Sequence, residues 1–272
     1  MTLDTHKLQQ EANGMLAPSV YQAIYETAYS APDGDILEIG TAHGAATIAL
    51  AQGMKDAGKN GRILTIDKIT GGSRERYGDV ATNEAIIRDN FRQFGVDSMI
   101  RFYIGESQQC AKDLPDDMHI SVLMLDADGA IDRDLRLFMD YCHYDTRVIM
   151  DDCHDSIKLK HAKRTLYIDQ KHRLTYLLVT YLDDNGGLCR DDMDGETWFG
   201  RIRDKHMLAE ILKSEAIYEI YRQLIFAQQY ITMATHPRSR NIIDRISQAT
   251  QKYPGLHRHL KNVYEKTLKK GA

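Results

Sequence analysis

The chain has 272 residues, of which 43% are hydrophobic and 27% are charged, as in an ordinary globular protein. This composition excludes a disordered chain, a fibre and a bundle of membrane helices. Lys and Arg number 35 and Asp and Glu 39, so the net charge of −4 gives no electrostatic reason to expect nucleic acid as a partner. The length allows one or two domains and a core that needs neither disulfides nor a structural metal.

The cysteines and the N-terminus give no sign of secretion or of a redox site. The four cysteines are Cys110, Cys142, Cys153 and Cys189. No two of them form a C-x-x-C pair, which argues against a zinc ribbon or a thioredoxin-like motif. No apolar run reaches the roughly 18 residues of a membrane span, and Met1–Asn13 lacks the apolar centre of a signal peptide. We expect a cytoplasmic protein with no membrane partner.

The first 34 residues are predicted to form an N-terminal helical cap. Pro18 is a favourable first-turn residue of a helix. Three tyrosines follow at intervals of four, on one helical face: Tyr21, Tyr25 and Tyr29. This stripe either packs on the body of the protein or forms a lid over a substrate pocket. The sequence APDG at residues 31–34 then predicts a turn.

From Asp35 to Asp152, short apolar runs alternate with longer amphipathic stretches. The short runs predict strands over Asp35–Ile39, Arg62–Asp67, Met99–Ile104, Ile120–Leu125 and Arg147–Asp151. The longer stretches predict helices over Ala45–Ala57, Asn83–Phe94, Ser107–Leu114 and Asp132–Cys142. Repeated strand–helix units with right-handed crossovers predict an α/β fold, a doubly wound Rossmann-like parallel sheet.

The pattern changes after Asp152. We expect, in order, a helix over Ser156–His172, a β-like run over Leu174–Leu182, a turn at Asp183–Gly187 and a last strand over Glu196–Ile202. From Asp204 to the end, the apolar residues keep a helical period. The sequence therefore predicts an α/β domain over residues 35–203 and a C-terminal helical extension over 204–272, which either caps the site or makes a homodimer contact.

A glycine turn follows the first predicted strand. The residues from Glu38 to Gly44 have the spacing E-x-G-x-x-x-G. Gly40 can adopt the backbone angles of a sharp turn, at the end of the strand where ligands bind in open α/β sheets. The pattern is not G-x-G-x-x-G, which argues against the alternative of a nucleotide-dependent oxidoreductase. Asp67 ends the second strand and is placed either to bind ribose hydroxyls or to cap a helix.

These features resemble the class I S-adenosylmethionine-dependent methyltransferases over residues 35–152, and Ile104–Gln108 is similar to the adenine-binding loop of catechol-type O-methyltransferases. The resemblance implies contacts of Gly40, Thr41 and Ala42 with the methionine part, of Asp67 with the ribose, and of the Glu106–Gln108 segment with adenine. The cofactor-binding residues implied are Glu38, Gly40, Thr41, Ala42, Gly44, Asp67, Glu106, Ser107, Gln108 and Asp126.

Acidic residues follow the fourth and fifth strands. Because neighbouring parallel strands lie about 4.8 Å apart, we expect Asp126, Asp151 and Asp152 to converge. Three adjacent carboxylates repel one another unless a proton or a cation neutralises them, and Mg²⁺ is the default ion for such oxygen ligands. The pattern resembles the metal ligands of the catechol, caffeoyl-coenzyme A and macrocin types of O-methyltransferase. The alternative is an acidic loop that caps helices.

Together these motifs predict methyl transfer from S-adenosylmethionine to a hydroxyl of a small molecule, a phenol, catechol or sugar, assisted by Mg²⁺. The resembled enzymes commonly have Lys or His three residues after the first metal ligand, whereas this chain has Gly129. Candidates for the catalytic base are Asp126 itself, Asp128 and His154. The remaining alternatives are a metal-independent N- or C-methyltransferase and a non-catalytic module that binds S-adenosylmethionine.

Overall fold

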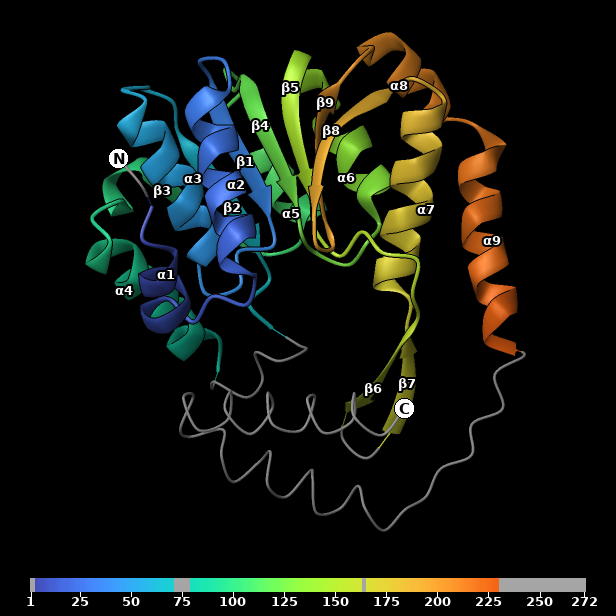
Figure 1. Cartoon of the computed structure of the whole chain (residues 1–272), viewed down its shortest axis with the longest axis horizontal. Coiled ribbons are helices and arrows are strands. Elements are labelled where there is room, and N and C mark those ends of the chain that lie inside the picture. The colour runs from blue at the N-terminus through green and yellow to red at the C-terminus, as the bar shows by residue number, and fades with distance from the viewer. Residues whose placement is uncertain (1–2, 71–78, 163–164, 230–272) are drawn as a thin grey trace.

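The computed structural model describes residues 3–70, 79–162 and 165–229. Its main element is a seven-stranded sheet of order β3-β2-β1-β4-β5-β9-β8, with helices on both faces (Figure 1). The strands are β1 (Asp35–Ile39), β2 (Ile63–Asp67), β3 (Ile100–Ile104), β4 (Ile120–Leu125), β5 (Cys142–Met150), β8 (Leu188–Asp194) and β9 (Thr197–Ile202). β1 to β5 are parallel, and β9 and β8 run antiparallel beside β5. The predicted doubly wound sheet is confirmed.

The helices of the described residues are α1 (Thr5–Glu11), α2 (Pro18–Ser30), α3 (Ala45–Asp56), α4 (Val80–Gln93), α5 (Ser107–Cys110), α6 (Ile131–Phe138), α7 (Lys171–Asp184), α8 (Lys205–Leu212) and α9 (Glu215–Gln229). The chain order reverses between β1 and β4, which lie side by side at the centre of the sheet. Ligands of open α/β sheets bind at the carboxyl ends of strands at such a reversal.

The sheet separates two hydrophobic cores because successive side chains of a strand point to opposite faces. Leu37 and Leu123 belong to the core on one face, and Ile36 and Val122 belong to the core on the other. All residues of β1, β2 and β4 are buried, as expected for strands covered on both faces. This burial fixes the strands and thus the positions of the residues at their ends.

The tyrosine stripe of α2 packs on the body of the protein. Tyr21 and Tyr25 are buried, whereas Tyr29 is about half exposed. The Tyr25 hydroxyl donates a hydrogen bond of 2.9 Å to Asp56 of α3. The two helices pack so closely that a Cβ at Gly53 would lie 2.3 Å from the Tyr25 carbonyl oxygen. Of the two alternatives for the stripe, packing against α3 describes Tyr25.

The helix predicted over Ser156–His172 is wrong. This segment forms an antiparallel pair of strands, β6 (Lys158–Ala162) and β7 (Thr165–Asp169), outside the main sheet. The sequence of β7, TLYID, is rich in β-branched and aromatic residues, which favour strands. This preference, together with the pairing of the two strands along their whole length, outweighed the helix-forming lysines.

The β-like run predicted over Leu174–Leu182 is also wrong, because the segment lies inside α7. Its buried residues are Thr175, Leu178, Val179 and Leu182 on the described helix, together with His172 in the first turn. Their spacing of three and four places them on one helical face, which packs against the core. Burial of this face outweighed the strand preference of the β-branched residues.

The strand β8 is absent from the prediction, while β9 matches the expected last strand. Most side chains of β8 are exposed, and its sequence, LCRDDMD, is acidic. Charged residues on an edge strand prevent pairing with other chains, so an edge strand does not need an apolar pattern.

The predicted C-terminal extension is helical over α8 and α9, as far as the structure describes it. The rest of that prediction, residues 230–272, lies outside the described residues, and so does a homodimer contact made there. Within the described ranges, no helix has the length and apolar character needed to cross a membrane.

Candidate active site

The glycine turn joins the carboxyl ends of the two central strands. Gly40 has a φ of 104°, and a Cβ on it would lie 2.0 Å from the Asp126 carbonyl oxygen. Gly44 has a φ of 86° at the N-cap of α3, and its missing Cβ leaves room for the Phe91 ring. Ala42 also has a positive φ, of 50°. The predicted turn therefore requires glycine at two positions and lies directly against the loop that follows β4.

Glu38 of β1 is fully buried beneath this turn. One of its oxygens, Oε2, accepts hydrogen bonds of 2.5 Å from the hydroxyls of Thr47 and Thr65. The other, Oε1, has no hydrogen-bond partner among the described residues. Burial raises the pKa of Glu38 to about 7, although the two threonines oppose the shift. A buried acceptor without a partner fits a site that receives a donor group from a ligand.

Asp67 ties the end of β2 to the glycine turn. Its Oδ2 accepts a hydrogen bond of 3.0 Å from the amide of Ala42, and its Oδ1 accepts one of 2.6 Å from the amide of Ile69. The structure therefore places Asp67 beside the turn, where the sequence predicted it.

The segment after β3 divides into exposed and buried side chains. Glu106 and Gln108 are exposed, whereas Ser107 is buried. The Ser107 hydroxyl donates a hydrogen bond of 2.6 Å to Asp134 of α6. Glu106 and Gln108 are therefore free of the core and accessible to a ligand, while the Ser107 hydroxyl already joins α5 to α6.

The three predicted metal ligands meet at the ends of β4 and β5. One oxygen from each of Asp126, Asp151 and Asp152 lies within 4.8 Å of the others. Asp152 has a φ of 58°, a left-handed conformation at which the chain turns sharply after Asp151. The Thr197 hydroxyl of β9 donates a hydrogen bond of 2.5 Å to Asp151 Oδ1. Burial, together with the charges of Asp126 and Asp152, raises the pKa of Asp151 to about 7.

The sequence analysis missed Lys171, the first residue of α7. Its Nζ lies 2.8 Å from Asp126 Oδ1 and 2.6 Å from Asp152 Oδ2. Burial alone would lower the pKa of Lys171, but these two carboxylates outweigh burial and hold the pKa above its ordinary value. No motif indicated this lysine, because the sequence placed it at the end of a helix predicted over Ser156–His172, whereas it begins α7.

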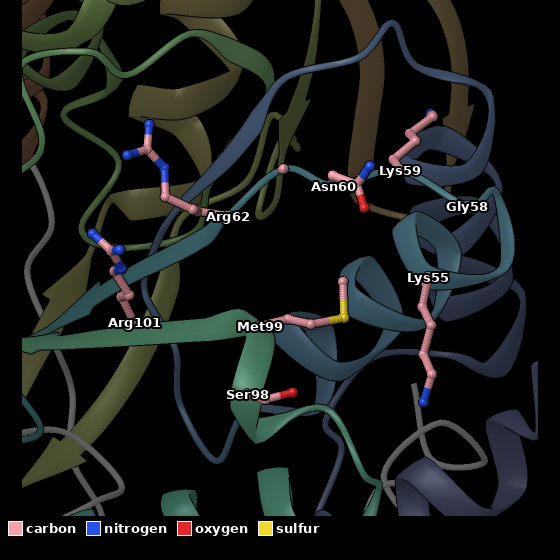
Figure 2. Close-up of a pocket in the computed structure, with 9 residues that line it drawn as sticks. Lys55, Gly58, Lys59, Asn60, Arg62, Ser98, Met99 and Arg101 are labelled. Atoms are coloured by element: carbon pink, nitrogen blue, oxygen red, sulfur yellow. The ribbon is translucent and has the colours of Figure 1, made fainter.

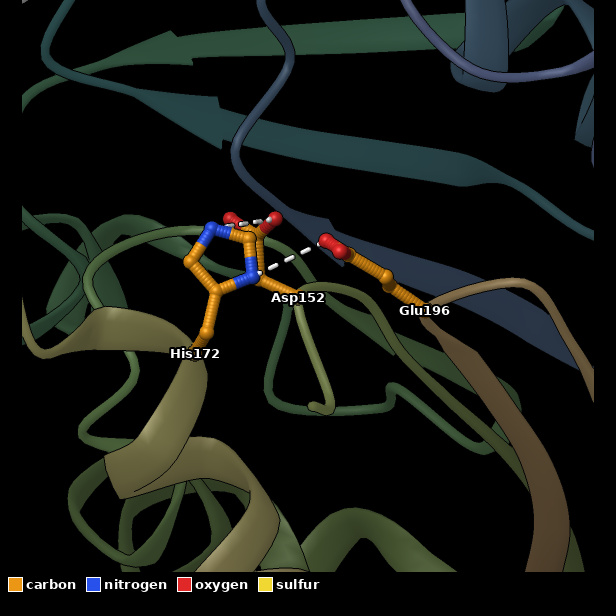
Figure 3. Close-up of side chains that lie close together, drawn as sticks. All are labelled: Asp152, His172 and Glu196. Atoms are coloured by element: carbon orange, nitrogen blue, oxygen red, sulfur yellow. Dashed lines mark ion pairs between the residues drawn. The ribbon is translucent and has the colours of Figure 1, made fainter. Parts of the chain in front are cut away.

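Two further side chains extend the acidic cluster toward β9 (Figure 3). His172 Nε2 lies 3.1 Å from Asp152 Oδ1, and His172 Nδ1 lies 3.0 Å from Glu196 Oε2, although the ring is not aligned for a hydrogen bond to Glu196. Lys158 Nζ lies 3.0 Å from the same Glu196 oxygen. Burial lowers the pKa of His172, with Asp152 opposing the shift. Acidic and basic side chains thus alternate in space, in the order Asp126, Lys171, Asp152, His172, Glu196 and Lys158.

Two predicted catalytic candidates, Asp128 and His154, belong neither to the three clustered acids nor to the group of Asp152, His172 and Glu196. Asp128 forms an ion pair of 2.8 Å with Arg133, which outweighs the effect of burial and lowers the pKa of Asp128. His154 is exposed, and its amide donates a hydrogen bond of 3.2 Å to the Asp152 carbonyl. Neither residue is in a group of the described side chains that could hold a metal ion. Asp126 is the predicted catalytic candidate that lies in the acidic cluster.

A separate depression of about 500 Å³ lies before β2 and β3 (Figure 2). Its lining includes Lys55, Lys59, Arg62 and Arg101. The Lys59 ammonium donates hydrogen bonds to the carbonyl oxygens of Ala28 and Ala31 at the end of α2. Arg62 forms an ion pair with Asp35. The depression lies at the amino ends of β2 and β3, away from the acidic cluster, and two of its basic groups, Lys59 and Arg62, have structural partners.

Residues 37–153 match a family model described as a methyltransferase domain. The chain therefore contains a methyltransferase domain. The match spans the glycine turn, Asp67, the segment after β3 and the acids that follow β4 and β5. No curated protein matches the chain in a sequence comparison.

The chain also resembles solved structures. They include the O-methyltransferase TomG from Streptomyces achromogenes in complex with S-adenosylmethionine, 13% identical, with a TM-score of 0.51 over 74% of this chain and 88% of that one. An O-methyltransferase from Bacillus cereus with S-adenosylhomocysteine is 15% identical, with a TM-score of 0.50 over 74% and 90%. The methyltransferase PaMTH1 from Podospora anserina is 14% identical, with a TM-score of 0.50 over 74% and 85%. These similarities confirm the class I methyltransferase fold.

Proposed function

We propose that the chain transfers a methyl group from S-adenosylmethionine to a hydroxyl of a small molecule, with Mg²⁺ or another divalent ion bound at the acidic cluster. The observation that carries this proposal is the meeting of Asp126, Asp151 and Asp152 beside the glycine turn. The turn and the cluster are in contact, because the Gly40 backbone packs on that of Asp126. A cofactor on the turn and an acceptor at the cluster would therefore be neighbours.

The residues below the turn fit S-adenosylmethionine. The unpartnered oxygen of Glu38 offers an acceptor for a donor group of the cofactor, and Asp67 stands at the end of β2, where an acid binds ribose hydroxyls. The solved structures with S-adenosylmethionine and S-adenosylhomocysteine share this fold and support the choice of cofactor.

The acidic cluster fits a hard divalent ion, because its ligands are carboxylate oxygens on two adjacent strand ends. Such an ion would lower the pKa of a hydroxyl bound to it and would fix the orientation of that hydroxyl. The chain's own residues orient the cluster: Thr197 holds Asp151 through its hydrogen bond, and His172 contacts Asp152 from the other side. The geometry would then hold the acceptor oxygen in line with the methyl group.

Transfer to oxygen is supported by the solved structures whose names state that activity. We propose a hydroxylated small molecule as the acceptor, either a phenol or catechol or a sugar. A phenolic hydroxyl needs the least help in losing its proton, which suits a site in which Asp128 and His154 lie away from the acidic cluster.

Methyl turnover with labelled S-adenosylmethionine on a panel of phenols, catechols and sugars tests the proposal. We expect turnover on at least one acceptor, loss of that turnover in excess chelator and recovery with Mg²⁺. Binding of S-adenosylhomocysteine without turnover on any member of the panel would favour the non-catalytic module.

A second candidate, metal-free methyl transfer, is favoured by one observation. The Lys171 ammonium already contacts Asp126 and Asp152 and neutralises part of their charge without a metal ion. Under this alternative, turnover continues unchanged in excess chelator, so the same assay separates the two candidates.

A further inference from the structure

The closest charge contacts of the site join one lysine to two of the three gathered carboxylates. Lys171 Nζ lies 2.8 Å from Asp126 Oδ1 and 2.6 Å from Asp152 Oδ2, and the lysine side chain is only 16% exposed. We propose that Lys171 is the resident cation of the acidic cluster, which a divalent ion must displace in order to bind Asp126 and Asp152. This inference rests on the proposed function, because it concerns the same metal site.

The ammonium and a divalent ion compete for the same oxygens. Mg²⁺ coordinates oxygen at about 2.1 Å, so an ion bound to Asp126 Oδ1 would lie within about 5 Å of Nζ where it now stands. Two positive charges at this separation repel strongly, because the site is largely shielded from water. The carboxylate side chains of Asp126 and Asp152 are only 21% and 22% exposed. Binding of the ion therefore requires movement of the Lys171 side chain.

The displacement involves the side chain and leaves the helix in place. The Lys171 amide donates a hydrogen bond of 3.0 Å to Asp169 Oδ1, and the Lys171 carbonyl accepts one of 3.0 Å from the Thr175 hydroxyl. The first turn of α7 is thus anchored through its backbone, whereas the side chain is held by its ion pairs. A lysine has a four-carbon stem with several rotatable bonds, so its Nζ can leave the carboxylates by rotation alone.

Gly129 provides the room that brings Lys171 to the cluster. This buried glycine has a φ of 85°, and a Cβ on it would lie 2.8 Å from the Lys171 carbonyl oxygen and 3.2 Å from the Lys171 Cα. Any side chain at position 129 would therefore push the first turn of α7 away from the loop after β4. The glycine and the lysine form one arrangement, in which the missing side chain of one residue permits the ion pairs of the other.

Binding of Mn²⁺ to the full-length protein, measured by calorimetry and by electron paramagnetic resonance, tests the inference without an activity assay. The variants are Lys171→Met and Lys171→Gln, with Asp152→Asn as the variant that removes a ligand. Lys158→Met is the matched control. It also removes one lysine charge, but from an ion pair with Glu196, which is not one of the three clustered acids Asp126, Asp151 and Asp152. Circular dichroism checks that each variant is folded.

We expect both Lys171 variants to bind Mn²⁺ roughly tenfold or more tightly than the wild type, since a competing cation is gone. Lys158→Met changes the affinity by less than about twofold, because its charge is farther from the ion and is screened. Equal Mn²⁺ affinity in the wild type and both Lys171 variants, with loss of binding in Asp152→Asn, would overturn the proposal that Lys171 competes with the ion. The proposed metal site itself would stand. No binding to any variant would overturn both the inference and the metal part of the proposed function.

Discussion

The two halves of the candidate site come from regions that differ in how their sequence encodes them. The segment from β1 to the end of β5 places Gly40, Asp67 and the three clustered acids at strand ends. The segment after β5 adds Lys171, His172 and Glu196 from a helix and a hairpin connection. The first region supplies anionic and backbone groups at positions set by the sheet. The second supplies two basic side chains that contact the acids, Lys171 and His172, and one further acid, Glu196. The predictions below test whether this division of roles is correct.

The largest expected effect is at the glycine turn. Gly40→Ala would place a Cβ 2.0 Å from the Asp126 carbonyl oxygen, so we expect loss of S-adenosylhomocysteine binding and destabilisation well beyond the strain of a positive φ. The matched control is Gly58→Ala, which has a φ of 70° but open space around its Cβ, and should cost about 1 kcal/mol. Calorimetry and chemical denaturation measure both. Equal effects of the two substitutions would show that the contact with Asp126 is unimportant.

The next effect is at the acidic cluster. Asp151→Asn removes one of the three gathered carboxylates and weakens the contact with Thr197, so we expect turnover to fall by roughly a hundredfold or more at limiting Mg²⁺. Asp116→Asn, an exposed acid before β4, serves as the control for the change in net charge. The initial rate as a function of Mg²⁺ concentration provides the measurement. A variant as active as the wild type, with the turnover of both unchanged by excess chelator, would assign the reaction to the metal-free alternative.

Asp151 also predicts a dependence of stability on pH. Its pKa is about 7 in the folded chain and near 4 in the unfolded chain, so the folded state binds the extra proton. The contribution of this group to stability is complete below about pH 4 and is lost as the pH rises through 7. In chelator, we expect Asp151→Asn to be less stable than or equal to the wild type at pH 5 and more stable at pH 8, by roughly 1–3 kcal/mol. Denaturant unfolding at these two pH values measures the difference. A gap that does not change between pH 5 and pH 8 would contradict the raised pKa.

The smallest effect lies away from the site, at the N-terminal helices. Tyr25→Phe removes the hydrogen bond to Asp56 and should cost about 1 kcal/mol of stability, with no change in the KM of an acceptor. Tyr29→Ala, on the exposed end of the same stripe, should change neither quantity by much. A raised KM in either variant would restore the lid as the role of this stripe.

The sequence predicted the first region because its signals are local. A strand covered on both faces has a continuous apolar sequence, and the turn and the acids come directly after the strands. Gly40, Asp126 and Asp151 could therefore be placed at strand ends without a structure. The parallel topology then required the strand ends to meet at one edge. The residues that follow β5 lack such signals. There, local preference predicted a helix where β6 and β7 lie and a strand inside α7.

The cations of the second region could not be found from the sequence for a physical reason. Lys171 reaches Asp126 across 45 positions of the chain, and the contact depends on the packing of α7 against Gly129. In the sequence, Gly129 is only a position that lacks the lysine or histidine of the resembled enzymes. Its positive φ and its closeness to Lys171 are tertiary facts, and only the structure connects the two residues.

The central claim is that a divalent ion on the strand-end acids lies beside the methyl group of S-adenosylmethionine. Nuclear magnetic resonance of the protein with ¹³C-methyl S-adenosylmethionine, titrated with Mn²⁺, measures this directly. We predict strong paramagnetic broadening of the bound methyl signal in the wild type and a sharp signal in Asp151→Asn at the same Mn²⁺ concentration. A bound methyl signal that stays sharp in the wild type at saturating Mn²⁺ would contradict the claim.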